Sequence, residues 1–483
     1  MNPSRRHFLL WAGGLSALSL SGCPTVNLAG LLPPAKPVSP LGAPPKATEI
    51  DPVSHVLNRL TFGPIPGAHA RVTRMGVDRF IEEQLTPEAI DDAWCDYQTG
   101  RFETLRLPVG ELFEYKEDFL QKEATEAKLF RAVYSRRQLL EVMVDFWTDH
   151  FNIDLTKGDC PWLKVADDRD VVRKHALGSF PAMLRASALS PAMLWYLDGR
   201  SNRRDTDQAM PNENYARELL ELHTMGVNGG YTQQDVMEAA RCLTGWYVRS
   251  EELTKKGHVV FRPAWHDDGE KRVLGHTIPE GQGEKDLDRL LDIVALHPAT
   301  ARFIATKLCR YFVSDSPPKQ AVETVAGAFL NHRGDMPPTL NALFHTDAFR
   351  ASAGARFKRP FRYLVSALRA TSAETRGGGE LPGYLERMGH APFQYPTPDG
   401  YPHEEGPWLG SLLWRWHFAV AFARNAVPGV KVDWDALRTG LGGDNGLMAH
   451  LLGRQPDADE RTAIAASGLV PAALLASPAF QRY

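Results

Sequence analysis

Acidic residues are concentrated, together with an arginine and a histidine, in the segment NENYARELLELHTMGVNGGYTQQD (Asn212–Asp235). On a helix, Glu213, Arg217 and Glu221 follow one another at four-residue spacing and form an i, i+4 ladder. Such a ladder is most simply a row of ion pairs that contributes about 0.2–0.5 kcal/mol per pair. Glu218 lies near the boundary between the polar and apolar faces, so its direction decides whether the segment lines a site.

Two histidines fall on apolar helix faces. His223 lies in the middle of the apolar face of Asn212–Met225, and His150 shares a face with the apolar residues of Leu139–Phe151. A hydrogen-bonded core histidine is the commoner outcome for a single imidazole in such a place, whereas two imidazoles in one cavity could transfer protons or bind a metal. If the two helices pack together, we expect His150 and His223 to converge.

A His-Asp pair stands before an Asp-Gly turn in the segment GHVVFRPAWHDDGEKRVLGHTI (Gly257–Ile278). This segment has the composition of a β-hairpin, and an acid within the turn needs no catalytic explanation. His266 and Asp267 precede the turn, where such a pair can ligate a metal or orient a base. We therefore predict a divalent metal, zinc or iron, held by His150, His266 and Asp267, with His223 as a further donor.

The helix after the glycine pair Gly229-Gly230 carries polar residues with structural explanations. Its start, TQQD, has the capping-box spacing that makes Asp235 a cap partner. Glu238 and Arg241 lie one turn apart and are expected to pair.

An enzyme built on these segments would use Glu218 or Glu221 as general base and Arg217 as electrostatic stabiliser. The cavity would lie between the helices predicted at Lys128–Ile153, Asn212–Met225 and Thr232–Trp246. The other residues expected to line it are His223, Glu213, Asp235 and Arg241.

A late segment rich in proline and aromatic residues, PFQYPTPDGYPHEEGPW (Pro392–Trp408), carries Asp399, His403, Glu404 and Glu405. Carboxylates beside aromatic rings are what sugar binding and glycosidic chemistry require. The favoured alternative is a loop that its aromatic residues anchor to the body.

Apolar residues recur at spacings of three and four along most of the chain, which predicts helices. The expected fold is predominantly all-α: a multi-helix bundle-like body with one small β-hairpin insertion. Two short helices are expected over His55–Leu85 and one long helix over Lys128–Ile153. The predicted divisions are residues 1–23 (signal), 24–47 (proline-rich tether), 48–250 (N-terminal helical region), 251–280 (hairpin) and 281–483 (C-terminal helical region).

The first residues form an export signal, SRRHFLLWAGGLSALSLSGC. Arg5 and Arg6 resemble a twin-arginine signal, and the residues that end in Cys23 resemble a lipobox whose cysteine takes the lipid. This predicts a protein on the periplasmic side of the cell envelope, anchored by lipid at Cys23. Because the twin-arginine route carries folded proteins, it also favours a bound metal or prosthetic group.

Charge and cysteine usage exclude several classes of protein. There are 55 basic and 58 acidic residues, and the net charge of −3 leaves no electrostatic basis for nucleic-acid binding. The four cysteines after Cys23 show no C-x-x-C spacing, which argues against zinc ribbons and thioredoxin-like chemistry. One disulfide between distant cysteines stays open.

Several of these segments together resemble the bacterial family called domain of unknown function 1800. The resemblance rests on HVLNRLTFG, FWTDHFN, the long glutamate-rich segment, HDDGEKRVLG, HPATARFIATKLCRYFVSDSPP and KRPFRYLVSALRA, in this order from about Thr48 to Trp416. It implies a mostly helical, exported protein and a working partner from another exported family, domain of unknown function 1501, which is similar to sulfatases and alkaline phosphatases. It implies no established activity.

Three functions follow as hypotheses. The first is an exported enzyme that acts on an envelope or extracellular polymer and is metal-dependent if the predicted ligands converge. The second is a non-catalytic lipoprotein that binds and presents a co-exported hydrolase-like protein. The third is a helical protein that binds or cleaves glycans with its late aromatic segment.

Overall fold

The structure is a computed structural model that describes residues 50–206, 209–251 and 255–483. The predicted twin-arginine signal, the lipidation site Cys23 and the tether lie outside the described residues. The described residues all belong to one contact unit.

The first helical region forms three helices instead of the expected two, namely α2 (Pro52–Leu60), α3 (Ala68–Met75) and α4 (Val77–Leu85). Asp51 caps α2, since its carboxylate accepts from the Val53 and Ser54 amides. Gly76 separates α3 from α4 at a φ of +91°, a backbone conformation that glycine adopts at little cost. Gly76 therefore divides into two helices a segment whose apolar spacing alone predicts one continuous helix.

The long helix predicted at Lys128–Ile153 is two helices, α7 (Glu117–Tyr134) and α8 (Gln138–His150). The break is fixed by side chains: Ser135 Oγ donates to the Asp92 carboxylate at 2.6 Å, and the Gln138 amide donates to the Ser135 carbonyl at 2.8 Å. Almost every side chain of α8 is buried, so this helix runs through the interior and is not amphipathic in the usual sense.

The remaining helices cover most of the chain. Between α4 and α7 lie the short helices α5 (Ala93–Thr99) and α6 (Val109–Leu112). After α8 come α9 (Cys160–Asp167), the π-helix η5 (Asp168–Arg173), α10 (Phe180–Ala188), α11 (Pro191–Tyr196), α12 (Asn214–Glu218), the π-helix η7 (Leu219–Thr224) and α13 (Gln233–Cys242). The second half contains α14 (Lys285–Ala295), α15 (Pro298–Phe312), α16 (Lys319–Asn331), α17 (Met336–Phe344), α18 (Asp347–Arg350), α19 (Pro360–Ala370), α20 (Leu381–Arg387), the 3-10 helix η10 (Gly406–Ser411), α21 (Leu412–Ala423), α22 (Trp434–Gly440), α23 (Asp444–Leu452), α24 (Ala458–Ala466) and α25 (Val470–Ala476).

Strands are short and few in the described ranges. They are β1 (Trp246–Val248), β2 (Val259–Phe261), β3 (Lys271–Val273), β4 (His276–Ile278), β5 (Glu374–Thr375) and β6 (Val430–Lys431), paired antiparallel as β1–β2, β3–β4 and β5–β6. The predicted pairing across the Asp-Asp-Gly turn was wrong, because β2 pairs back with β1 and β3 pairs with β4. The tight turn is Leu274-Gly275, where both residues have a positive φ, as a two-residue hairpin turn requires.

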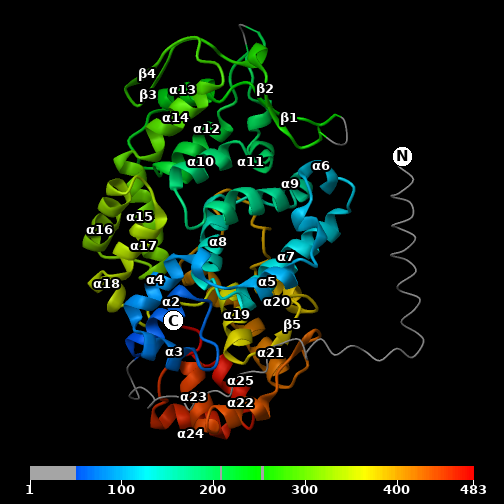
Figure 1. The fold of residues 1–483 in the computed structure, drawn as a ribbon, viewed down its shortest axis with the longest axis vertical. Helices are drawn as coiled ribbons and strands as arrows, with labels where there is room; N and C mark the ends of the chain where they lie inside the picture. The colour runs from blue at the N-terminus through cyan, green and yellow to red at the C-terminus, as the bar shows by residue number, and fades with distance from the viewer. Residues whose placement is uncertain (1–49, 207–208, 252–254) are drawn as a thin grey trace, which may run out of the picture. The chain divides into compact units, whose positions relative to one another are not determined.

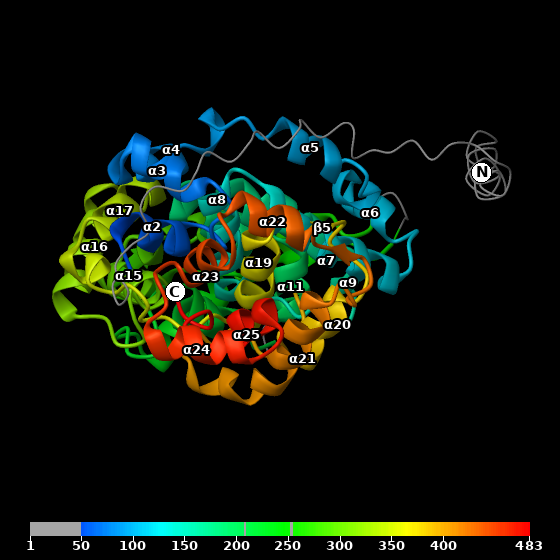
Figure 2. The same ribbon diagram turned by 90° about the horizontal axis from the view of Figure 1, so that it is seen from below.

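One hydrophobic core extends from Val56 to Phe480 and takes side chains from both predicted helical regions. In Figure 1, α8 lies in the middle of the body, α21–α25 lie at one end, and α13, α14 and the hairpin β3–β4 lie at the other. Figure 2 shows the C-terminal helices from below, with α21 and α5 on opposite sides of the body. The predominantly all-α fold is thus confirmed, with three small antiparallel pairs in place of one hairpin.

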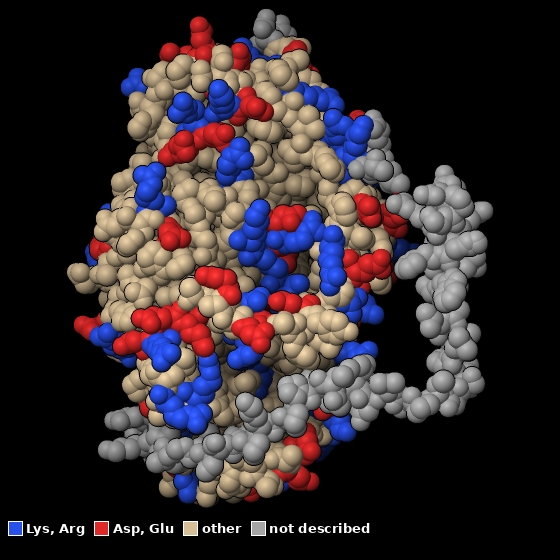
Figure 3. Space-filling model, in the orientation of Figure 1, with Lys and Arg blue, Asp and Glu red and all other residues tan. Residues whose placement is uncertain are grey.

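All four described cysteines are buried and free, so the described residues contain no disulfide; they are Cys95, Cys160, Cys242 and Cys309. None of the described helices is both long and apolar enough to cross a membrane. The face of the molecule in Figure 3 mixes acidic and basic side chains and shows no large region of one sign, in keeping with the balanced charge of the sequence.

Candidate functional site

The acidic motif begins as an α-helix and continues as a π-helix. α12 ends at Glu218, and in η7 the amide of Met225 donates to the Leu220 carbonyl, five residues back, at 2.8 Å. The hydroxyl of Thr224 donates to the Leu219 carbonyl at 2.7 Å and supports this wider turn. Single π-turns inside helices are rare and recur at functional sites.

The first part of the acidic ladder is structural. The Arg217 guanidinium donates to the Glu213 carboxylate and to the Gln233 side-chain carbonyl, both at 2.9 Å. Gln233 in turn donates to Glu213 at 2.7 Å, so the three side chains connect α12 to the first residue of α13. Arg217 is 40% exposed in this position, and its guanidinium is already occupied.

The two later glutamates of the motif differ in their partners. The Tyr231 hydroxyl is hydrogen-bonded to Glu221, which places that carboxylate over the turn between η7 and α13. Glu218 makes no hydrogen bond or ion pair with its side chain in the described part of the chain and is half-buried. Burial raises the pKa of Glu218, repulsion from Glu221 and Asp399 adds to the rise, and the charge of Arg217 opposes it. The side chain of Glu218 therefore makes no polar contact that stabilises the described fold.

Lys307 on α15 is a cationic group that, like Glu218, has no ion-pair partner in the described part of the chain. Helix α15 packs against η7, and Lys307 makes no ion pair among residues 50–206, 209–251 and 255–483. Burial lowers the pKa of Lys307 to about 8, although the nearby carboxylates of Asp149 and Asp399 act in the opposite direction. The charge of Asp399 thus acts on both groups and raises the pKa of Glu218 and of Lys307.

The charge of Lys307 also acts on three histidines; we call His150, His223 and His403 the histidine cluster. The predicted convergence of the first two is observed, since their ring centroids are 6.2 Å apart. His150 and His403 each stack on the ring of Phe146, with centroids 6.4 and 6.0 Å from it. Burial lowers the pKa of all three imidazoles, that of His223 to about 3, and the charge of Lys307 lowers each of them further. The cluster is therefore neutral at pH 7.

Several nitrogens of the histidine cluster have no partner. His150 Nε2 donates to the His223 carbonyl at 3.1 Å, which leaves the lone pair of His150 Nδ1 unused. Both ring nitrogens of His223, His403 Nδ1 and the hydroxyl of the neighbouring Tyr215 are also buried without a partner in the structure. Buried polar atoms normally have partners, which ordered water or a polar ligand would supply here.

An ion-pair network on α8 lies beside the cluster, and sequence analysis missed it. The Asp145 carboxylate pairs with Lys128 at 3.0 Å and with Arg359 at 2.5 Å, and Arg359 also pairs with Asp149. Burial alone would raise the pKa of Asp145, but Lys128 and Arg359 outweigh it and hold this pKa well below its usual range. Asp145 and Asp149 can be buried because Lys128 of α7 and Arg359, the residue before α19, neutralise them.

The late segment is held over the end of α8 by the backbone. The side-chain amide of Asn152 donates to the carbonyls of Tyr395 and Thr397, at 2.9 and 2.8 Å. Gly400 has a φ of +76°, and a Cβ at this position would lie 2.1 Å from the Asp149 carbonyl oxygen. Only glycine permits this approach, and it places Asp399 near Lys307.

The aromatic residues of the late segment are anchors. Tyr401 and Trp408 are buried in a separate cluster with Phe357, and Tyr395 packs against it. They do not offer an open platform for a sugar ring.

The predicted residues around the β-strands have structural roles. The Asp267 carboxylate accepts hydrogen bonds from Nε and Nη2 of Arg241, at 2.8 and 3.0 Å, and from Arg204 at 2.6 Å. The expected Glu238–Arg241 pair is present at 2.8 Å. The expected capping box is also present, and the Asp235 carboxylate additionally accepts from the Leu274 amide at 2.7 Å. These contacts fasten the β3–β4 hairpin to α13.

The predicted metal ligands do not converge. His266 contacts Asp286 through Nε2 at 3.0 Å and the carbonyl of Thr244 through Nδ1 at 2.9 Å, so both of its nitrogens are engaged. His150 shares no contact with His266 or Asp267. The residues that the structure describes contain no group of three or more histidine, cysteine or carboxylate side chains placed to hold a metal ion.

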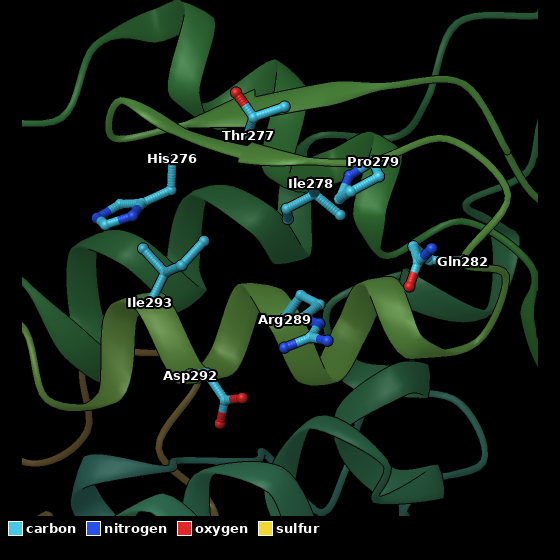
Figure 4. Close-up of a pocket in the computed structure, with 8 residues that line it drawn as sticks. All are labelled: His276, Thr277, Ile278, Pro279, Gln282, Arg289, Asp292 and Ile293. Carbon is cyan, nitrogen blue, oxygen red and sulfur yellow. The ribbon is translucent and has the colours of Figure 1, made fainter.

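A pocket of about 410 Å³ lies elsewhere, between β4 and α14 (Figure 4). Its volume suits a small ligand. It is lined by His276, Thr277, Ile278, Pro279, Gln282, Arg289, Asp292 and Ile293. None of these residues was predicted to be functional.

Lys307, Arg359 and Asp149 lie in segments on which the family resemblance rests. A family model described as "Protein of unknown function (DUF1800)" matches residues 55–482. No curated protein and no solved structure matches the chain. The chain belongs to the DUF1800 family of proteins of unknown function.

Proposed function

We propose that this protein is an exported cell-envelope enzyme that acts on an envelope or extracellular polymer and uses Glu218 and Lys307 for acid–base chemistry. The observation that supports this most is a carboxyl group with a raised pKa on α12 and an ammonium group with a lowered pKa on α15, both without ion-pair partners in the described chain. Active sites typically contain titratable groups whose pKa values are shifted in opposite directions and whose side chains do not stabilise the fold.

The roles follow from the protonation states. At pH 7 Lys307 is mostly protonated, yet its pKa of about 8 lets it give up a proton more readily than an ordinary lysine. Glu218, with its raised pKa, is a stronger base than an ordinary glutamate. Glu218 would take the proton of an attacking water or hydroxyl, and Lys307 would donate one to the leaving group.

The histidine cluster would bind the substrate. His150 Nδ1 can only accept a hydrogen bond in the present tautomer, and His223 offers one donor and one acceptor. Neutral donors and acceptors of this kind suit hydroxyl or amide groups, which envelope polysaccharides and peptides carry. Substrate in the envelope is expected because residues 1–23 have the pattern of a twin-arginine lipoprotein signal ending in Cys23.

Release of fragments from isolated envelope tests the proposal. Natively exported protein is incubated with peptidoglycan sacculi, with lipopolysaccharide and with extracellular polysaccharide, and soluble products are measured by mass spectrometry. We expect Glu218→Gln and Lys307→Met to lower the rate about 100-fold or more, the usual contribution of a general acid or base.

Two control variants make the same substitutions at a glutamate and a lysine outside the proposed site. Glu213→Gln removes an acid of the same helix that pairs only with Arg217 and Gln233, and Lys122→Met removes an exposed lysine of α7. Both should retain the rate of the wild type. If all four variants release the same fragments at the same rate, or if none of the polymers is altered by the wild type, the non-catalytic lipoprotein becomes the better account.

A further inference from the structure

Helix α21 presents apolar side chains to solvent along one face. Leu409 of η10 precedes Leu413, Trp416 and Val420 at spacings of four, three and four residues, which is the repeat of a single helix face. These side chains are 47%, 59%, 54% and 39% exposed, and Trp414 beside them is 36% exposed. We call these five residues the α21 stripe.

The opposite face of α21 already has its partners. Arg415, Phe418, Ala419 and Phe422 are buried, and the helix packs against α25. The helix therefore carries two apolar faces, of which the fold uses one. Large exposed apolar side chains gathered on one element indicate an interaction surface.

We propose that the α21 stripe lies in the headgroup region of a lipid bilayer and fixes the orientation of the body on the membrane. The inference rests on the lipid anchor at Cys23 that is part of the proposed function. Tryptophan and leucine on one helix face are the side chains that enter this region, because the indole ring has both apolar surface and a polar N–H group.

Charge also favours a membrane. The residues from Gly406 to Asn425 contain no aspartate or glutamate, and Arg424, at the end of α21, is exposed. The guanidinium of Arg387, on α20, lies 5.4 Å from the ring of Trp414 at the border of the stripe, and it also pairs with Glu380 at 3.3 Å. Cations beside an apolar helix face suit the anionic surface of a bilayer.

The size of the stripe argues against a stable protein partner. Five partly exposed side chains of about 150–250 Å² each when fully exposed present together roughly 500 Å². A standard protein interface buries about 800 Å² on each partner. A lipid surface has no such requirement, because the anchor already holds the protein there.

The chain before the described body is long enough to need an orienting contact. Twenty-six residues separate Cys23 from Ile50, from position 24 to position 49. At about 3.3–3.6 Å per residue they span at most roughly 90 Å, so the anchor by itself permits many orientations of the body. Contact through the stripe would select one of them and fix which way the site near Lys307 faces.

The test uses a fluorescent label on the full lipidated protein. Trp416→Cys is labelled with the environment-sensitive fluorophore NBD and reconstituted into phosphatidylethanolamine–phosphatidylglycerol vesicles. The four described cysteines are buried, so the label should react at position 416 alone. Tyr97→Cys, on α5 and 79% exposed, is the control. Figure 2 shows α5 and α21 on opposite sides of the body.

Two quenchers distinguish the outcomes. We expect the label at 416 to be protected from aqueous iodide and to lose about half or more of its emission to lipids with a nitroxide near the headgroup, since interfacial helices lie about 5–10 Å deep. The label at 97 should behave in the opposite way. With Leu413→Glu added, iodide should quench the label at 416 and the nitroxide lipids should no longer quench it.

Three results would overturn the inference. If iodide reaches both labels equally, the stripe faces water. If the label at 416 is protected from iodide but is not quenched by the nitroxide lipids, protein covers it, whether a second copy, an exported partner or another segment of this chain. If the nitroxide signal survives Leu413→Glu, the contact does not depend on the stripe. Mass spectrometry of Cys23 in the same sample shows separately whether the lipid anchor exists.

Discussion

Replacing Lys307 with methionine should make the protein more stable. A lysine without an ion pair, buried enough to lower its pKa to about 8, is held in its charged form at a cost at neutral pH. Methionine has nearly the same length and volume and needs no solvation or partner. A residue that is kept although it lowers stability is expected at a site selected for function.

The size of the effect follows from the pKa. A decrease from about 10.4 to about 8 corresponds to roughly 3 kcal/mol, at about 1.36 kcal/mol per pKa unit. Because the unfolded chain binds the proton more tightly, the cost is fully present below about pH 8 and disappears as the pH rises through the window between about 8 and 10.4. For a body of roughly 430 residues with an unfolding entropy of about 0.9 kcal/mol/K, the melting temperature should rise by about 3–4 °C at pH 7.

Thermal unfolding at several pH values is the assay. Lys307→Met should exceed the wild type at pH 7, and the difference should shrink steadily between pH 8 and pH 10. The control Lys122→Met, at an exposed lysine, should stay within about 0.5 kcal/mol of the wild type at every pH. A lower melting temperature for Lys307→Met at pH 7 would refute the reasoning, since it would mean that the fold relies on this charge.

Three further predictions separate the site from its support. His223→Phe should leave stability unchanged or raise it by about 1 kcal/mol in thermal unfolding, because it removes two buried nitrogens without partners; a loss above 2 kcal/mol would show that they are bonded. Arg359→Met should lower the unfolding free energy in urea by about 3–5 kcal/mol because it leaves Asp145 and Asp149 without their shared cation, and a neutral result would contradict the network. Asp235→Ala should cost about 1 kcal/mol and increase hydrogen exchange at the Leu274 amide, and unchanged exchange there would show that the hairpin does not depend on this carboxylate.

Local patterns predicted local structure well. The capping box at Thr232 and Asp235 and the ion pair of Glu238 with Arg241 depend on residues three positions apart, and both are present. The convergence of His150 with His223 was also predictable, because two apolar helix faces must share a core.

Partners distant in sequence were not predictable. Asp145 lies on a row of acids that reads as a solvent face, and only the fold brings Arg359, 214 residues away, to neutralise it. Lys307 looks like an ordinary lysine of an amphipathic helix, and its lowered pKa comes from burial that no spacing reveals. The predicted pairing of the β-strands was wrong for a related reason, since the turn at Leu274-Gly275 competes with an equally plausible Asp-Gly turn six residues earlier.

The pKa of Lys307 tests the central claim most directly. Trace acylation of the folded protein at a series of pH values, followed by mass spectrometry of the peptide that contains residue 307, gives the titration of this one amine. We predict a midpoint near pH 8, and a lower midpoint in Asp399→Asn, because the lost carboxylate no longer favours the charged form. A midpoint near the ordinary lysine value of about 10.4, unchanged by Asp399→Asn, would contradict the proposed acid–base site.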